Sequence, residues 1–150
     1  MSPEKWGPPV WNLFHTFAEK LKESSFPIVG LELFNYIYRI SSYLPCPDCS
    51  NHARLFLGKI NRNKIRSKKD LIDLLYIFHN SVNKRKNKNI YNYEHINTYT
   101  NKKLIESYNN FISIYHTKGN MKLLTETFQR NMIMKDLKKW MIKNIKHFDP

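Results

Sequence analysis

Two cysteines, Cys46 and Cys49, are the residues best suited to chemistry, because they lie three positions apart and are the only two in 150 residues. A disulfide between such near neighbours closes too short a loop to stabilise a fold by much. Redox exchange and metal ligation therefore remain as the two roles expected of these cysteines. Pro47 suits the first position of a helix, where free N–H groups and the helix dipole stabilise a thiolate, although Asp48 opposes this by charge repulsion.

The surroundings of the two cysteines favour redox chemistry over metal binding. A thioredoxin-type dithiol would follow a β-strand, whereas the flanks here have helical periodicity. Zinc could be bound by both cysteines and His52, with His79 or His15 as the fourth ligand. The second close pair of ligands that is common in structural zinc sites is missing. A zinc-binding structural or interaction module stays the alternative.

Two further motifs flank the cysteines and make the pattern more specific. The chain contains, in order, Trp6-Gly7-Pro8-Pro9-Val10-Trp11 with His15, then Pro45-Cys46-Pro47-Asp48-Cys49, then His79-Asn80-Ser81-Val82-Asn83. Over roughly residues 6–93 this set resembles the Erv/ALR family of FAD-linked sulfhydryl oxidases. The resemblance implies a helical bundle that binds FAD, with a redox-active CxxC pair beside the flavin ring.

The resemblance also implies a set of cofactor-binding residues in the first and third motifs. A flavin nucleotide needs flat side chains, hydrogen-bonding groups and positive charge for its diphosphate, and the residues after the third motif are basic. Asn87 replaces the family's usual glycine, and asparagine tolerates left-handed backbone angles. The predicted cofactor-binding residues are Gly7, Trp11, His15, His79, Asn80, Asn83, Lys84 and Lys88.

By the same resemblance, Cys46 and Cys49 are the predicted catalytic residues. A protein dithiol would attack the disulfide at Cys46, and Cys49 would face the flavin, which passes electrons to O₂ and yields H₂O₂. The chain lacks the second, structural disulfide and the shuttle cysteines that many family members carry. Without that disulfide, the flavin site must be held by packing. Such a minimal form resembles the versions encoded by large DNA viruses.

Helical spacing of apolar residues runs through almost the whole chain and predicts the elements that position these motifs. Pro8 and Pro9 suit the first turn of a helix, and Pro45 ends a second one. A short helix is expected from Cys46–Pro47 to Gly58. Ser67 and Asp70 resemble a capping box that opens the fourth helix.

The C-terminal part continues the helical pattern. Residues 84–101 indicate a connector, and a fifth helix follows from Leu104 to Tyr115. Gly119 is expected to separate it from a sixth, whose apolar stripe includes Leu124, Phe128, Leu137, Trp140, Met141 and Ile145. The predicted fold is all-α: a four-helix bundle that binds FAD (residues 1–95), with additional C-terminal helices (residues 96–150) packed on the same domain.

Composition bounds the possible partners. Hydrophobic residues make up 41% of the chain, which argues against disorder, and no apolar run reaches the length of a membrane span. The net charge of +13 is concentrated in residues 59–88 and 118–146, so nucleic acid is a possible partner, without a recognition motif. With no secretory signal in sight, we expect a cytoplasmic protein, in the host cytoplasm or virion if it is viral. Homodimerisation is expected from the resemblance.

Overall fold

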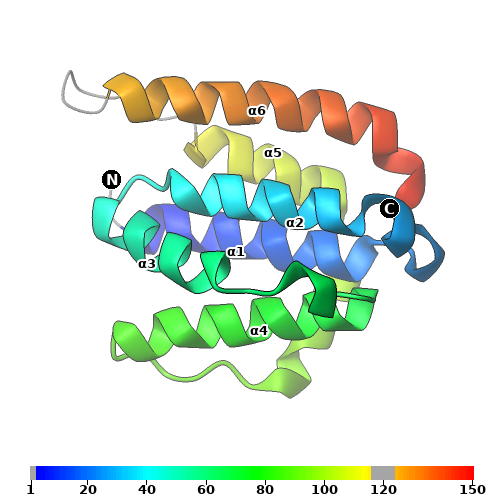
Figure 1. Ribbon diagram of the computed structural model, residues 1–150, viewed down its shortest axis with the longest axis horizontal. Coiled ribbons are helices and arrows are strands. Elements are labelled where there is room, and N and C mark those ends of the chain that lie inside the picture. The colour runs from blue at the N-terminus through cyan, green and yellow to red at the C-terminus, as the bar shows by residue number, and fades with distance from the viewer. Residues whose placement is uncertain (1–2, 116–123) are drawn as a thin grey trace.

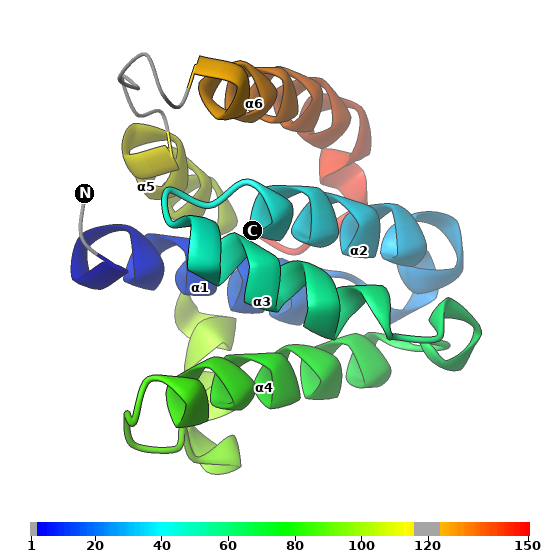
Figure 2. The same cartoon turned by 60° about the vertical axis from the view of Figure 1, so that its left-hand side comes forward.

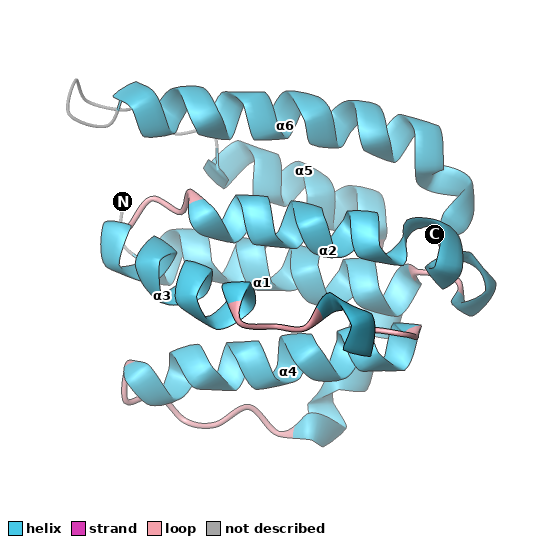
Figure 3. Ribbon diagram, in the orientation of Figure 1, coloured by secondary structure: helices cyan, strands magenta, loops and turns pink. Residues whose placement is uncertain are grey.

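The computed structural model describes residues 3–115 and 124–150, and helices dominate them throughout (Figure 3). Within these residues the extended pairing is limited to an isolated bridge between Leu21 and Phe148. This confirms the predicted all-α fold. None of the described helices is both long and apolar enough to cross a membrane.

The helices that carry the three motifs lie side by side (Figure 1). Helix α2 packs against α3, and α1 packs against α4. Short 3₁₀ turns connect them, η1 (Glu23–Ser25) before α2 and η2 (Arg62–Lys64) before α4. The four helices are α1 (Pro3–Lys20), α2 (Phe26–Ser42), α3 (Pro47–Gly58) and α4 (Lys68–Arg85).

Two of these helices begin where the sequence predicts. Cys46 is the N-cap of α3, and its sulfur accepts a hydrogen bond from the backbone N–H of Cys49 at 3.3 Å. Ser67 is the N-cap of α4, and its hydroxyl accepts from the N–H of Asp70 at 3.1 Å. Each cap satisfies a backbone donor that the first turn leaves free. The helix that starts after Cys46 therefore fixes both sulfurs at its N-terminus.

Helix α1 differs from the prediction at its start. It begins at Pro3, so Pro8 and Pro9 lie inside the helix and not in its first turn. The helix extends because Trp6, only 5% exposed, buries its side chain in the core and anchors the extra turn. Packing of a large aromatic side chain here outweighs the loss of the two backbone donors that proline lacks.

The C-terminal part adds the helices α5 (Leu104–Tyr115), which packs on α1, and α6 (Leu124–Asn144), which packs on α2, on the side of the bundle that faces away from α4 (Figure 2). The predicted connector is only partly irregular, because a 3₁₀ helix, η3 (Tyr93–Asn101), packs on α1 and buries Ile96. Helices α5 and α6 follow this 3₁₀ helix, with η5 (Ile145–His147) at the end. The predicted separator Gly119 lies outside the described residues.

Helices α5 and α6 share one apolar core with the bundle. Phe111, Leu137 and Trp140 belong to the same cluster of buried side chains as Phe14 and Phe34 of α1 and α2. The predicted α6 stripe is wrong at two positions, since Phe128 and Ile145 are 61% and 44% exposed. Spacing alone does not show which residues meet the core: α6 turns Phe128 to solvent, and Ile145 lies beyond α6, in η5. The side chain of Leu124 is outside the described residues.

Candidate active site

The disulfide between Cys46 and Cys49 places two sulfur atoms in different surroundings. Cys49 is 8% exposed and lines a pocket, whereas Cys46 is half-buried and does not belong to the pocket wall. The hydroxyl of Ser50 bonds both the N–H and the carbonyl of Leu44, which ties the end of α2 to the start of α3. The disulfide therefore sits in a braced turn, with one sulfur toward the pocket and the other outside it.

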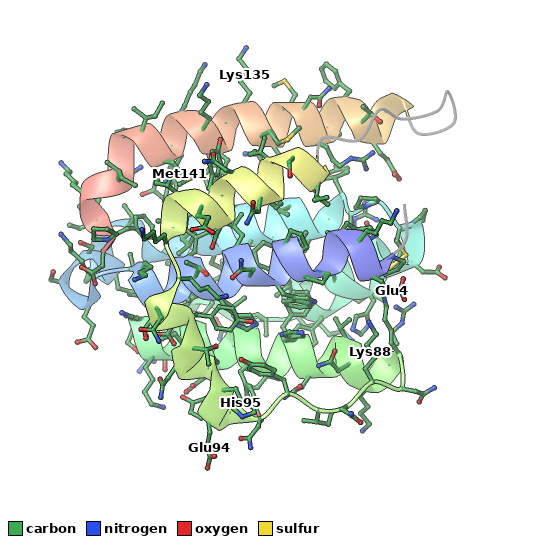
Figure 4. All side chains as sticks on the ribbon, turned by 180° about the vertical axis from the view of Figure 1, so that it is seen from behind. Glu4, Lys88, Glu94, His95, Lys135 and Met141 are labelled. Atoms are coloured by element: carbon green, nitrogen blue, oxygen red, sulfur yellow. A yellow bond between two sulfur atoms is a disulfide. The ribbon has the colours of Figure 1, made fainter. Side chains whose placement is uncertain are left out.

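The pocket has a volume of about 900 Å³ and lies where the first half of α1, the start of α3 and the end of α4 meet. Figure 4 shows Glu4 and Lys88 at this end of the molecule. Part of its wall is apolar and buried, with Val10, Phe14 and Phe78. A volume of this size and such a wall are typical of a cofactor site.

Basic side chains line another part of the same pocket. Arg85, Lys86 and Lys88 belong to its wall, together with Glu4. The ammonium of Lys86 lies 5.8 Å from the ring centroid of Trp6. Burial lowers the pKa of Lys86, and the charges of Lys88 and Arg85 lower it further. This concentration of positive charge suits a phosphate-bearing ligand.

A stack of aromatic rings forms the wall between α1 and α4. The rings of Trp11 and His79 are nearly parallel, 7° apart in orientation, with centroids 4.0 Å apart. Behind them, the buried His15 makes a 3.0 Å hydrogen bond between its Nε2 and Nδ1 of His79, and the ring of Tyr99 stacks on His15. Each ring is fixed by a neighbour, so the pocket wall is set before any ligand binds.

Both histidines of this stack are neutral at pH 7. Burial, aided by the charge of His79, lowers the pKa of His15 to about 3. Burial, aided by the charge of Lys88, lowers the pKa of His79 to about 4. In a neutral pair, one ring donates its N–H and the other accepts it.

The structure brings five of the predicted cofactor-binding residues to the pocket wall, and they are Gly7, Trp11, His79, Asn83 and Lys88. Apart from its two chain neighbours and the backbone of its own helix, no atom of the described residues lies within 4 Å of the position that a Cβ of Gly7 would take. The backbone at Gly7 is thus open. Near the end of the basic run, Asn87 has φ of 56°, which confirms the left-handed conformation expected of it.

The other three predicted residues lie off the pocket wall. His15 is buried behind His79. Asn80 holds the following loop, because its side-chain amide accepts from the N–H of Tyr91 at 2.7 Å and donates to that residue's carbonyl at 3.0 Å. Lys84 lines a second, shallower groove with Ile77; this groove adjoins the pocket because Arg85 belongs to both walls. A shift of one residue along α4, from His79 to Asn80 or from Asn83 to Lys84, turns the side chain onto another face of the helix.

Several residues of the pocket wall were missed by the sequence analysis. Ser41 is on the apolar stripe of α2, where the sequence carries no sign of a ligand. His52 could have been found, since it lies one turn after Cys49; its Nε2 lies 3.2 Å from the hydroxyl of Ser81, and burial and then the charge of Arg85 lower its pKa. Others lie on α1, α4, η3 and α5, among them Trp6, Arg85, Lys86, Tyr99, Asn110 and Ser113.

The alternative of a zinc site is not supported by the geometry. Zinc is bound by thiolates, whereas Cys46 and Cys49 are joined to each other. His52 lies against Ser81. Across residues 3–115 and 124–150, no three histidine, cysteine or carboxylate side chains gather in a way that could hold a metal ion.

Comparison with known proteins covers the part of the chain that carries these motifs. The chain is 32% identical over 91 residues to the protein of Invertebrate iridescent virus 6 that is named "Putative FAD-linked sulfhydryl oxidase 347L"; the match covers 57% of this chain and 82% of that protein. It is 33% identical over 85 residues to the FAD-linked sulfhydryl oxidase of African swine fever virus, covering 57% and 71%.

A cellular protein is also similar. The chain is 25% identical over 87 residues to the mitochondrial FAD-linked sulfhydryl oxidase erv1 of Schizosaccharomyces pombe, over 57% of this chain and 48% of that protein. No solved structure matches the chain significantly. The model of the Erv1/Alr family matches residues 8–103, which include most of the bundle, the disulfide and the ring stack. The chain therefore belongs to the Erv1/Alr family.

Proposed function

We propose that this protein is a FAD-linked sulfhydryl oxidase that converts dithiols of other proteins into disulfides. The observation that carries the proposal is the position of Cys49, which belongs both to a disulfide and to the wall of a large pocket. A sulfur in that position can exchange electrons with a bound redox cofactor. The names of the viral and yeast relatives support the same activity.

The residues of the pocket fit FAD. The apolar wall formed by Val10, Phe14 and Phe78 suits a flat ring system beside Cys49. Asn83 offers an amide for hydrogen bonds. Arg85, Lys86 and Lys88 offer charge for a diphosphate, and among the described residues of the wall the basic side chains outnumber the acidic ones.

In the proposed reaction, the substrate first reacts with the sulfur outside the pocket. A thiolate of the substrate attacks Sγ of Cys46, the Cys46–Cys49 bond breaks, and Cys49 leaves as a thiolate. The second substrate thiol, after losing its proton, attacks the mixed disulfide and releases Cys46. The substrate has then lost two electrons and two protons, and both cysteines are reduced.

The chain's own residues prepare each sulfur for this exchange. The N-terminus of α3 stabilises negative charge on the sulfur of Cys46, which already accepts the N–H of Cys49. The buried position of Cys49 keeps substrate thiols away from it and toward Cys46. FAD, when bound, supplies the two-electron acceptor that reoxidises the dithiol and passes the electrons to O₂, with H₂O₂ as product.

Oxygen uptake in the presence of dithiothreitol tests the proposal. The purified protein, supplied with FAD, should consume oxygen and release H₂O₂. Cys49→Ser should abolish turnover and retain FAD, because the serine cannot carry electrons while the pocket wall is kept. FAD-loaded wild-type protein that leaves dithiothreitol unoxidised would contradict the proposal.

The homodimer and the cytoplasmic or virion location stay predictions.

A further inference from the structure

Two buried polar atoms on the pocket wall have no hydrogen-bond partner within the described chain. They are Nε1 of Trp6 and the hydroxyl oxygen of Ser41, in side chains that are 5% and 1% exposed. Almost all buried polar groups in folded proteins are paired. Both residues line the pocket that contains Cys49. An unpaired buried group that borders a cavity is suited to bond whatever fills the cavity.

The two neighbouring serines of α2 differ: the hydroxyl of Ser42 has a hydrogen-bond partner, and the hydroxyl of Ser41 has none among the described residues. Both serines lie in the last turn of α2. The hydroxyl of Ser42 donates to the carbonyl of Tyr38, one turn earlier, at 2.8 Å. This is the usual way in which a serine inside a helix satisfies itself. Ser41 makes no such bond and turns to the pocket wall instead.

The position of Ser41 relates it to the redox sulfur. Ser41, Leu44 and Cys49 line the same pocket, and Leu44 is tied to the first turn of α3 by Ser50. The same wall has apolar side chains, such as Val10, Phe14 and Phe78, which offer a flat ring no hydrogen bonds. A hydroxyl can both donate and accept, and it can therefore match either a carbonyl oxygen or a ring N–H.

Trp6 requires a more restricted partner. An indole N–H only donates, so it needs an acceptor atom. The ammonium of Lys86 lies 5.8 Å from the same indole ring, and Lys88 lines the pocket too. Positive charge at this distance favours an oxygen that carries negative charge, as phosphate oxygens do.

We propose that Ser41 and Trp6 are hydrogen-bonding residues of the cofactor site. The Ser41 hydroxyl bonds the polar edge of the ring system held beside Cys49, and the Trp6 N–H donates to an acceptor oxygen of the same ligand. The inference rests on the proposed FAD-linked function. It assigns a ligand-binding role to two residues that are not among the predicted cofactor-binding residues: Trp6, which opens the first motif, and Ser41, which lies outside the three motifs.

Substitution of Ser41 should lower the affinity for FAD without lowering the stability of the FAD-free protein. Ser41→Ala should weaken FAD binding about tenfold, the usual effect of one lost hydrogen bond to a bound ligand. The melting temperature of the FAD-free protein should stay unchanged or rise, because the substitution removes a hydroxyl that has no protein partner. Fluorescence titration with FAD and thermal unfolding of the FAD-free protein measure the two effects.

Ser42→Ala is the matched control on the same turn. It should lower the melting temperature of the FAD-free protein, because it removes the bond to Tyr38, and it should leave the affinity for FAD unchanged. Trp6→Phe should weaken FAD binding several-fold. Its control is Trp140→Phe, since the Trp140 N–H bonds Glu32 and lies off the pocket wall.

The outcomes separate this inference from the proposed function. Wild-type protein that takes up no FAD overturns the proposed function and the inference with it. Wild-type protein that binds FAD while Ser41→Ala binds it equally well overturns the inference alone. A Ser41→Ala variant that loses affinity and also loses stability without FAD has a structural role, which again overturns the inference.

Discussion

Polar side chains in the last turns of α4 and just beyond its end have different surroundings, and these decide their roles. Lys88 and Asn83 line the pocket with Cys49, whereas Lys84 lies in the adjoining groove and Asn80 holds the backbone of Tyr91. Since all four are polar and close in sequence, only their direction separates ligand-facing residues from the rest. The chemistry proposed for the pocket thus depends on a few residues of defined orientation.

The two lysines give the first test at this scale. Lys88→Ala should weaken FAD binding several-fold, because it removes positive charge from the pocket wall, and the loss should shrink at high salt. Lys84→Ala is the matched control and should bind FAD as the wild type does. Equilibrium dialysis at two salt concentrations measures both. Equal losses in the two variants would contradict the placement of Lys84 outside the pocket.

A similar comparison tests the ring stack. His79→Ala should weaken FAD retention and also loosen the wall, because it removes the partner of both Trp11 and His15. Trp11→Ala should weaken retention as well. Flavin content after gel filtration measures this. If both variants keep the flavin content of the wild type, these rings serve packing only.

At the scale of elements, the pair of His15 and His79 joins α1 to α4 through one partly buried hydrogen bond. In the folded protein the pKa of His15 is about 3 and the pKa of His79 is about 4, so both rings stay neutral down to that range of pH. An unfolded histidine takes up a proton near pH 6.5. Below pH 6.5 the unfolded chain therefore binds more protons than the folded one. Stability must then fall as the pH is lowered through this window.

The expected result is a melting temperature of the FAD-free protein that decreases from about pH 7 to about pH 5, above the range where most carboxylates titrate. His79→Gln should flatten the decrease, because one buried titrating ring is gone. Calorimetry across this range measures it. A melting temperature that is constant or rises on acidification would show that the rings are not held neutral.

The elements themselves could largely be predicted from the sequence, because local signals define them. The N-caps Cys46 and Ser67 are followed by helical apolar spacing, and the structure has α3 and α4 where these signals place them. The start of α1 could not be predicted, because the burial of Trp6 overrides the two prolines. Likewise, spacing alone could not show that Phe128 faces solvent.

At the scale of the whole molecule, the C-terminal end closes the fold by contacting α1. The N–H of Asp149 donates to the carbonyl of Lys20 at 2.7 Å, and the N–H of Leu104 donates to the carbonyl of Pro150 at 3.3 Å. Between these bonds Phe148 is 6% exposed and packs on Phe17 and Trp140. The last residues thus help to hold the helix that carries Trp11 and His15.

Loss of this contact should destabilise the whole molecule. Phe148→Ala should lower the free energy of unfolding by about 3 kcal/mol, since it empties a buried aromatic site. Ile142→Ala is the control, because Ile142 is 70% exposed, and it should change stability by less than about 0.5 kcal/mol. Urea unfolding measures both. Similar values for the two variants would mean that the C-terminal end is dispensable.

The full set of residues that line the pocket could not be predicted from the sequence, although the sequence contains the motifs that contribute to it. The spacing of Trp11 with His15, and of His79 with Asn83, indicates faces of helices, and it does not show which face meets the disulfide. The contributions of Ser41 from α2 and Asn110 from α5 arise only when distant helices pack. Residues that carry no motif become ligand-facing through tertiary contacts alone.

The most direct test of the account is the visible absorption spectrum of the FAD-loaded protein, recorded without oxygen before and after adding a dithiol. We expect a bound flavin band that bleaches in the wild type and persists in Cys49→Ser, because the electrons must pass through that sulfur. Absence of a bound flavin, or equal bleaching in the variant, would contradict the claim that Cys49 connects substrate thiols to a flavin in this pocket.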